Sequence, residues 1–238
     1  MDRLTRRQII QDLKERLNQF ERGNSADKGI ALPVGTAFDA LLPDDGLAWG
    51  SLIECLHEEG SGAADLMLRM ASQVLPAGGA LVVIDERGQF YPPAAAGIGI
   101  ALEHTVLVRP AHSRDAVWAM EQALRSRAAA VVLAWAGSLH DRIYRRLKLA
   151  AEAGACVGLL LRPIACRDEP SWADVRLRVN AAPSPQQALG RRLRVEIMQV
   201  RGGPSRPTVE LELCDETNHV RLVPRLADPT ASRRRTAG

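Results

Sequence analysis

The segment 54–65, Glu-Cys-Leu-His-Glu-Glu-Gly-Ser-Gly-Ala-Ala-Asp, lies between an apolar run and an amphipathic run. A phosphate-binding loop at such a place reads G-x-x-x-x-G-K-[ST]: its glycines bring backbone N–H groups near the phosphates, its Lys reaches the β/γ oxygens and its hydroxyl ligates magnesium. Here those four places hold His57, Gly62, Ala63 and Ala64. The loop therefore keeps one glycine and lacks both the cation and the metal ligand.

The charge of this segment also opposes nucleotide binding. Glu58, Glu59 and Asp65 place three carboxylates around a predicted helix N-terminus, where each would repel a triphosphate. We expect a degenerate loop that holds no Mg-ATP, no metal and no catalytic residue. The alternative is an ordinary strand-to-helix turn. The residues of the predicted degenerate loop are His57, Glu58, Glu59, Gly60, Ser61, Gly62, Ala63 and Ala64.

Composition indicates a globular protein of the cytoplasm. The chain has 238 residues, 46% hydrophobic and 25% charged, with a formal charge of +3, which is typical of one folded core. Its four cysteines form no C-x-x-C pair, which argues against zinc, and Cys55 and Cys156 lie in apolar runs, as buried reduced thiols do. No run approaches the roughly 18 apolar residues of a membrane span, so we expect no membrane contact.

The first 29 residues form a separate unit in this interpretation. Apolar residues recur every three or four positions over residues 3–22, which predicts an amphipathic helix ending at Gly23-Asn24-Ser25. The helix can pack on its own domain or on a partner, and the sequence leaves both open. The candidate partner-binding residues are Leu13, Leu17 and Phe20.

From residue 50 to 161, short apolar runs alternate with amphipathic ones, which predicts an α/β fold with a mostly parallel sheet flanked by helices. After residue 172, alternating charged and apolar residues predict added antiparallel strands near the C-terminus. We expect a core over 30–215 and, over 216–238, a basic disordered tail containing Arg233, Arg234 and Arg235. The expected strands are 50–55, 80–84, 105–109, 129–135, 155–161, 174–180, 191–201 and 208–213, and the expected helices are 63–75, 92–99, 113–127 and 139–152.

Several segments, read in order, resemble the RecA recombinase core. They are LIECLHEEGSGAADL (52–66), ALVVIDERGQFYPPAAAGIGI (80–100), EQALRSRAAAVVLAW (121–135), ADVRLRVN (173–180), RRLRVEIMQVRGG (191–203) and TVELEL (208–213). The resemblance implies a RecA-like core with a degenerate phosphate-binding loop. It places Ala134 where the Walker B aspartate belongs and Arg87 where the glutamate that activates water belongs, although another register would let Glu86 serve.

Within that group the chain resembles the ImuA family of SOS mutagenesis proteins, also described as SulA-like. GLAWGSLIECL, WAMEQALRS and YRRLKLAAEAG carry this resemblance. It implies a non-enzymatic, damage-inducible accessory factor of translesion DNA synthesis. The implied partners are ImuB, an inactive Y-family polymerase homologue, an error-prone subunit related to the replicative polymerase, and RecA.

A second hypothesis is a sequence-independent DNA-binding module. Arg142, Arg145, Arg146 and Lys148 crowd one predicted helix, and the arginine tail adds further positive charge. A solvated helix face is the plainer interpretation of the same residues. A third hypothesis, an ATPase with an unusual loop, ranks last.

Overall fold

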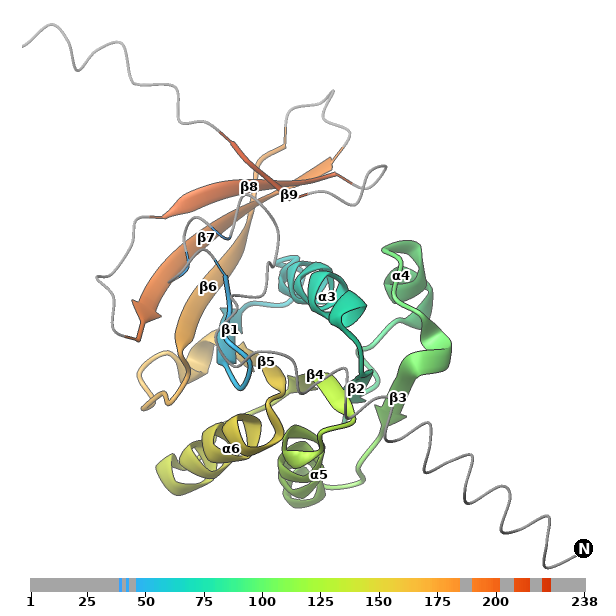
Figure 1. The fold of residues 1–238 in the computed structure, drawn as a ribbon. Helices are drawn as coiled ribbons and strands as arrows, with labels where there is room; N and C mark the ends of the chain where they lie inside the picture. Colours follow the sequence, from blue (N-terminus) through green and yellow to red (C-terminus); the bar gives the residue numbers. More distant parts are fainter. Residues whose placement is uncertain are drawn as a thin grey trace, which may run out of the picture.

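The computed structural model describes residues 46–184, 190–201, 208–214 and 220–223, together with Asp39 and Leu42. Within these residues nine strands form one sheet in the order β3-β2-β4-β5-β1-β6-β7-β8-β9. The strands from β3 to β6 are parallel neighbours, and the strands from β6 to β9 are antiparallel neighbours. The chain therefore joins a parallel core to an antiparallel ribbon without a break in the sheet (Figure 1).

The central parallel strands are short and almost entirely buried, as expected for strands covered on both faces, whereas the terminal strand β3 is partly exposed. β4, for example, reads Ala-Ala-Val-Val-Leu-Ala-Trp, and its first six residues are all buried. The strands of this part are β1 (Leu52–His57), β2 (Ala80–Ile84), β3 (Thr105–Val108), β4 (Ala129–Trp135), β5 (Val157–Pro163) and β6 (Val175–Ala182).

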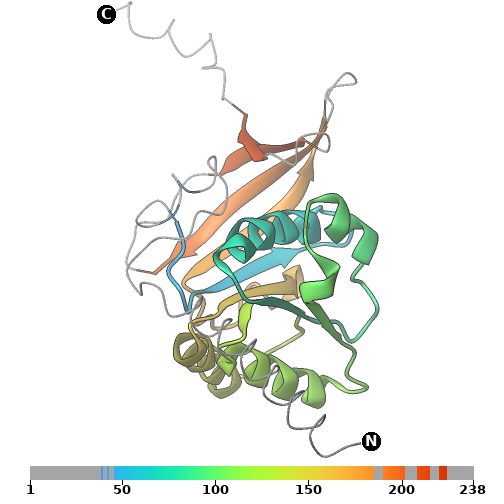
Figure 2. The same ribbon diagram turned by 45° about the vertical axis from the view of Figure 1, so that its right-hand side comes forward.

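Helices cover both faces of the parallel strands. α3 (Ala63–Val74) and α4 (Pro92–Gly97) lie on one face, and α5 (Ser113–Arg125) and α6 (Asp141–Gly154) lie side by side on the other. Figures 1 and 2 show the sheet between these two layers. Short 3₁₀ turns at Leu75–Ala77, Leu102–His104 and Ile164–Cys166 complete the connections.

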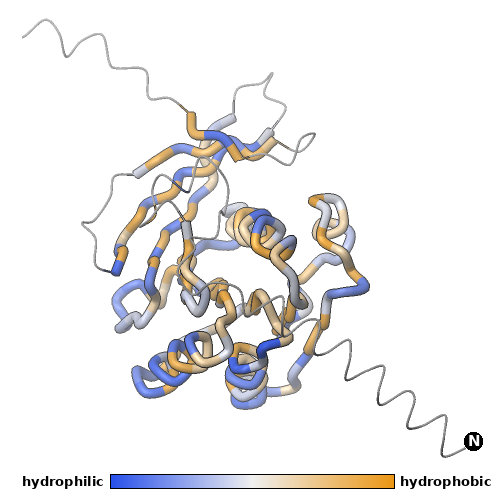
Figure 3. Tube along the Cα trace, in the orientation of Figure 1, coloured by the Kyte–Doolittle hydropathy of each residue, from blue (hydrophilic) through white to orange (hydrophobic). Residues whose placement is uncertain are grey.

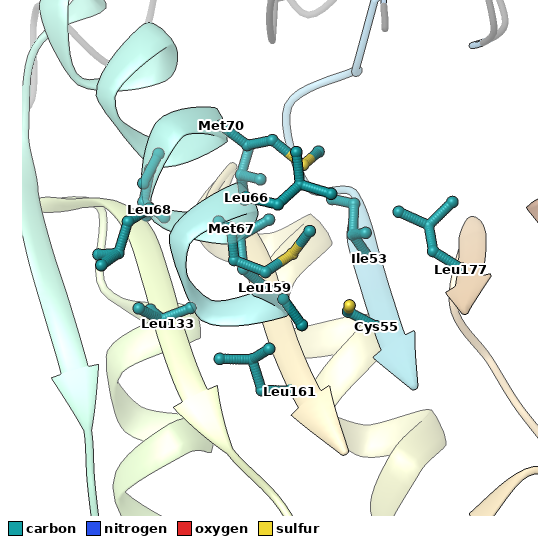
Figure 4. Packing of buried hydrophobic residues seen from close by; sticks show 14 of the residues in the cluster. Ile53, Cys55, Leu66, Met67, Leu68, Met70, Leu133, Leu159, Leu161 and Leu177 are labelled. Atoms are coloured by element: carbon teal, nitrogen blue, oxygen red, sulfur yellow. The ribbon is translucent and has the colours of Figure 1, made fainter. Parts of the chain in front are cut away.

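The larger apolar core lies between α3 and the centre of the sheet. Successive residues of β1 point to opposite faces, so that Leu52 packs in the α5–α6 layer while Ile53 and Cys55 pack under α3. Figure 4 shows Met67 of α3 above the strands that carry Cys55 and Leu159. Because each full burial of such a side chain contributes about 1.5–3 kcal/mol, this layer fixes the start of α3 relative to β1.

The antiparallel ribbon extends the sheet beyond the helices. Its strands are β7 (Gly190–Val200), β8 (Val209–Cys214) and β9 (Val220–Leu222). Apolar and polar residues alternate along β6 to β8 (Figure 3), and Leu193 and Leu211 face the α3 core. One face of the ribbon thus continues the core, and the other carries charges.

The predicted fold class is confirmed, and each strand or helix predicted between residues 50 and 213 lies within a few residues of an observed one. The tail predicted from residue 216 is wrong at its beginning, because β9 pairs with β8 through Leu222 and Leu211. β9 is three residues long, too short for a periodic signal. The helix predicted over 3–22 and residues 233–235 lie outside the described residues. None of the described helices is long and apolar enough to cross a membrane.

Candidate functional site

The loop between β1 and α3 has the turn geometry that its glycines permit. Gly60 and Gly62 have φ angles of +73° and +82°, in the left-handed region that favours glycine. The Ser61 amide donates to the Glu58 carbonyl oxygen at 3.2 Å, and the Leu66 amide donates to the Gly62 carbonyl oxygen at 3.1 Å. The loop therefore turns sharply from the strand into the helix, as the sequence predicts.

Gly62 is also required by close packing. A Cβ at this position would lie 2.7 Å from Cδ2 of Leu193, which belongs to β7 and is 2% exposed. The glycine is thus explained by its contact with the ribbon and by its φ angle. Its presence is no evidence that a phosphate approaches the backbone here.

The charged groups of the loop are arranged around Asp65 in the first turn of α3. Its two carboxylate oxygens accept hydrogen bonds from Arg69 Nε at 3.2 Å and from an Arg191 amino group at 2.8 Å. Asp65 is favourably placed at a helix N-terminus. Glu58 and Glu59 are exposed. Two cations near the helix start are therefore bound to a carboxylate of the chain itself.

A hollow of about 350 Å³ remains beside the loop. The loop residues 57–65 line it together with Phe90, Tyr91, Trp135 and Arg191. Space is therefore present where a nucleotide would lie in a RecA-like site. What differs is the chemistry of the lining, which has carboxylates at Glu58 and Glu59 and methyl groups at Ala63 and Ala64.

The other two positions of the predicted degenerate site lie on neighbouring strands. Ala134 is fully buried on β4, in register with Ile84 of β2 and Leu160 of β5. Arg87 is exposed in the turn after β2. Arg87 and His57 both line a hollow of about 210 Å³ at the carboxyl ends of the strands. Ala134 does not line it.

The acidic residues after β2 are hydrogen-bonded within the fold. Asp85 is fully buried and accepts from the amides of Gln89 at 2.9 Å and Phe90 at 2.8 Å. Glu86 accepts from the Ser113 hydroxyl at 2.9 Å. Asp85 thus shapes the turn that follows its strand. Among the described residues, no group of three or more His, Cys, Asp or Glu could hold a metal ion.

Three of the four basic residues predicted on one helix lie on its exposed side, and the fourth, Lys148, does not. Lys148 is 6% exposed, and its ammonium group donates to Asp174 at 2.6 Å and to the Gly50 carbonyl oxygen at 3.0 Å. The inclusion of Lys148 in a binding face is therefore wrong, because it lies on the buried side of α6. Arg142, Arg145 and Arg146 are exposed. Arg146 forms an ion pair with Glu121 of α5.

Sequence reasoning missed a buried charge cluster on the α6 side of β1. Glu54 and Arg162 are fully buried, and their side chains are 2.6 Å apart. Arg176 Nε lies 3.0 Å from Glu54, close enough for an ion pair but without hydrogen-bond geometry. Tyr144 and Ser171 donate to Glu54 at 3.1 and 2.5 Å. The charged residue in the middle of an apolar strand was the signal that this cluster existed.

Burial and the neighbouring charges raise the pKa values of Tyr144 and Arg162 in this cluster. Burial, followed by the Glu54 charge, raises the pKa of the Tyr144 hydroxyl. Burial lowers the pKa of Arg162, but Glu54 and Glu169 more than offset this, and the net pKa is raised. Arg162 therefore stays charged between Glu54 and Glu169, which it also contacts. We interpret the cluster as structural, because its residues join β1, β5, β6 and α6 and do not line either hollow.

Comparison with known proteins gives relatives of three kinds. The chain is 42% identical over 65 residues to the cell division inhibitor SulA of Edwardsiella piscicida, and 26% identical over 135 residues to RecA of Rhodopirellula baltica. These matches span 39% of that SulA and 36% of that RecA. The match to ImuA of Caulobacter vibrioides is 29% identical over 216 residues, 81% of this chain and 88% of ImuA. The chain is a RecA-like relative of ImuA.

The relationship to ImuA covers 81% of this chain, so the resemblance inferred from the sequence is confirmed. No family model matches the chain. Among solved structures, the RadB recombinase superposes with a TM-score of 0.62 at 16% identity, over 81% of this chain and all of RadB. At that identity the likeness shows the RecA-like fold alone.

Proposed function

We propose that this ImuA-related chain is a non-catalytic accessory protein of damage-inducible translesion DNA synthesis in the cytoplasm, and that it works by binding proteins. Its principal partner is an ImuB-type homologue of Y-family polymerases. RecA and an error-prone subunit of the replicative-polymerase type are further partners in this proposal. The observation that carries it is similarity to ImuA over 88% of that protein's length.

The geometry of the loop after β1 supports the non-catalytic part of the proposal. Phosphoryl transfer requires a cation on the β/γ-phosphates, a magnesium ligand and a group that positions the nucleophile. At the corresponding places this chain has Ala63, Ala64, Ala134 and Arg87. The nearby cations Arg69 and Arg191 both pair with Asp65, and its carboxylate offsets part of their positive charge.

An exposed sheet edge supports the protein-binding part. β3 is the terminal strand of the sheet, and an uncovered edge strand offers unpaired backbone groups to another chain. Val106 and Leu107 of this strand are 51% and 36% exposed, and Leu102 in the turn directly before it is 40% exposed. Large apolar residues gathered at an open edge are typical of a protein interface.

The test is the mass of the complex with the purified ImuB-type homologue, measured by light scattering during size-exclusion chromatography. We expect a defined complex for the wild-type chain without nucleotide. Val106→Asp should abolish it, because a charge on the edge strand opposes pairing with a partner strand. Leu222→Asp is the matched control: Leu222 is 39% exposed on β9, at the opposite edge, and the complex should persist.

If the wild-type chain forms no complex at low and moderate salt, the proposed function is wrong. If Val106→Asp and Leu222→Asp both leave the complex intact, the partner binds elsewhere and only the assignment to β3 fails. The predicted contributions of Leu13, Leu17 and Phe20 and of Arg233, Arg234 and Arg235 stay within this proposal. Truncations at 29 and 223 in the same assay separate them from the core.

A further inference from the structure

The outer sides of α5 and α6 form one continuous surface. Both helices precede neighbouring parallel strands, β4 and β5, so they run in the same direction. The ion pair between Glu121 and Arg146 joins the two helices at this surface. Trp118 and Arg142 each lie about one turn before that pair, which sets them at the same level. Figures 1 and 2 show the two helices side by side.

Helical spacing defines which side chains share this surface. On α5, Met120 and Leu124 are buried toward the sheet, so residues 114, 118 and 125, at intervals of four and seven, point away from it. Residues 142, 146 and 149 do the same on α6. We call this surface the α5–α6 face: Arg114, Trp118, Arg125, Arg142, Arg146 and Leu149.

The α5–α6 face combines exposed apolar groups with positive charge. Trp118 is 64% exposed and Leu149 is 51% exposed. The four arginines are exposed, and the side chains of Arg125 and Arg146 are 55% and 61% exposed. Figure 3 shows hydrophilic stretches along both helices. A tryptophan left largely in water among arginines has no role in the packing of this core.

The acidic residues of the two helices do not neutralise the face. Glu121 is largely buried between the helices and contacts both Arg125 and Arg146. Glu152 forms an ion pair with Lys148 at 3.3 Å, and Asp141 accepts from the Trp172 indole at 2.7 Å. Asp115 is exposed three residues before Trp118 and lies on the same side of α5, so it offsets one of the four arginine charges. The face therefore retains a net positive charge around two apolar side chains.

We propose that the α5–α6 face binds an acidic protein segment whose apolar side chain packs on Trp118, and that this segment belongs to the partner of the proposed function, on which the inference rests. Tryptophan and arginine are the residue types that carry most binding energy at protein interfaces. Carboxylates on the segment match the four arginines in charge. The face lies on the helix layer, so it is a second contact in addition to the β3 edge.

Single-stranded DNA fits this face less well. Such sites stack successive bases on several aromatic side chains within a basic groove. Here Trp118 is the aromatic residue among the six that define the face, the surface is a convex helix pair, and Glu121 holds two of the arginines. DNA is therefore an outcome that the test must detect, and it would overturn the proposal.

The experiment measures the Kd of the full chain for the purified ImuB-type homologue by calorimetry, at low and moderate salt. Trp118→Ala should weaken binding about 30-fold, as expected for an interface residue worth about 2 kcal/mol. The double variant Arg114→Glu/Arg142→Glu should weaken it about 10-fold or more and flatten the salt dependence. Arg221→Glu, a charge reversal at an exposed arginine on β9, is the control for a reversed charge outside the face and should bind like the wild type.

The outcomes are distinguishable. If the wild-type chain does not bind the homologue, the proposed function fails. If it binds and both α5–α6 variants bind equally well, the proposed function stands and this inference is wrong. A parallel titration with a 20-nucleotide oligo-dT tests DNA: tight binding that is lost in the double variant, with partner binding unchanged, would also overturn the inference. Unchanged melting temperatures will show that the variants are folded, because the substituted side chains are exposed.

Discussion

Glu54 in β1 and Glu58 in the loop after it are four residues apart on the chain, but one is buried and the other is exposed. Glu54, within β1, is fully buried, and arginine, tyrosine and serine side chains surround its carboxylate. Glu58, just after the same strand, is exposed at the mouth of an open hollow. A buried charge must be paired, because its desolvation is costly, whereas a loop at the edge of a sheet can change its chemistry without cost to the core. The loop after β1 can therefore differ from a phosphate-binding loop without destabilising the core.

The largest expected effect is on the free energy of unfolding when each of these two carboxylates is removed in turn. Glu54→Ala should lower the free energy of unfolding by about 3–5 kcal/mol, because it leaves Arg162 and Arg176 buried near an empty site. Glu58→Ala, the matched control, should change it by no more than about 0.5 kcal/mol. Urea denaturation followed by circular dichroism measures both. Equal effects of the two variants would show that the buried cluster does not support the fold.

A smaller expected effect is the loss of stability when an alanine replaces either glycine of the loop. Comparing the two variants separates backbone strain from packing. Gly60 and Gly62 both have positive φ angles, but a Cβ at Gly60 meets nothing within 4 Å, whereas one at Gly62 meets Leu193. Gly60→Ala should destabilise the protein by about 1 kcal/mol through strain alone. Gly62→Ala should cost about 1 kcal/mol more, because the buried leucine must move. The difference between their denaturation midpoints gives the contribution of the contact, and no difference would mean that the ribbon is not packed against the loop.

The smallest effect is a pH dependence that arises from the buried cluster. The raised pKa keeps Tyr144 protonated in the folded state, while the unfolded chain ionises it near its ordinary value of 10.0. The folded state thus binds the proton more tightly than the unfolded state does. Tyr144 therefore contributes its full stabilisation below pH 10. As the pH rises above 10, the free energy of unfolding falls by up to about 1.4 kcal/mol per pH unit.

Tyr144→Phe isolates this contribution. It should cost about 1 kcal/mol at neutral pH through the lost hydrogen bond to Glu54. Above pH 10 its stability should fall less steeply than that of the wild type, and the slope of the difference is the quantity to measure. Parallel curves for the two proteins would mean that the hydroxyl ionises equally in the folded and unfolded states.

Local pattern was enough to predict most of the fold. The apolar runs of β1, β2, β4 and β5 and the helices between them follow from periodicity, since each is long enough to show it. The position of the loop after β1 followed from the same pattern. β9 escaped prediction because three residues, Val220–Leu222, carry no period and become a strand only by pairing with β8.

The side-chain partners could not be predicted in the same way. Glu54 meets Arg162 and Arg176, more than 100 positions along the chain, and only the strand order brings them together. Lys148 looked like part of a basic face until the helix position relative to Asp174 was known. Trp118 shows the converse case: a tryptophan on an amphipathic helix is usually buried, but this one is exposed in the folded chain.

The most direct test of the central claim, a RecA-like frame without nucleotide chemistry, is a calorimetric titration of the full chain with Mg-ATP, with an active RecA as the positive control. We expect no saturable heat and no rise in melting temperature up to millimolar nucleotide. Saturable binding that shifts the melting temperature, above all if Ala63→Glu abolishes it, would contradict the claim and restore the ATPase interpretation.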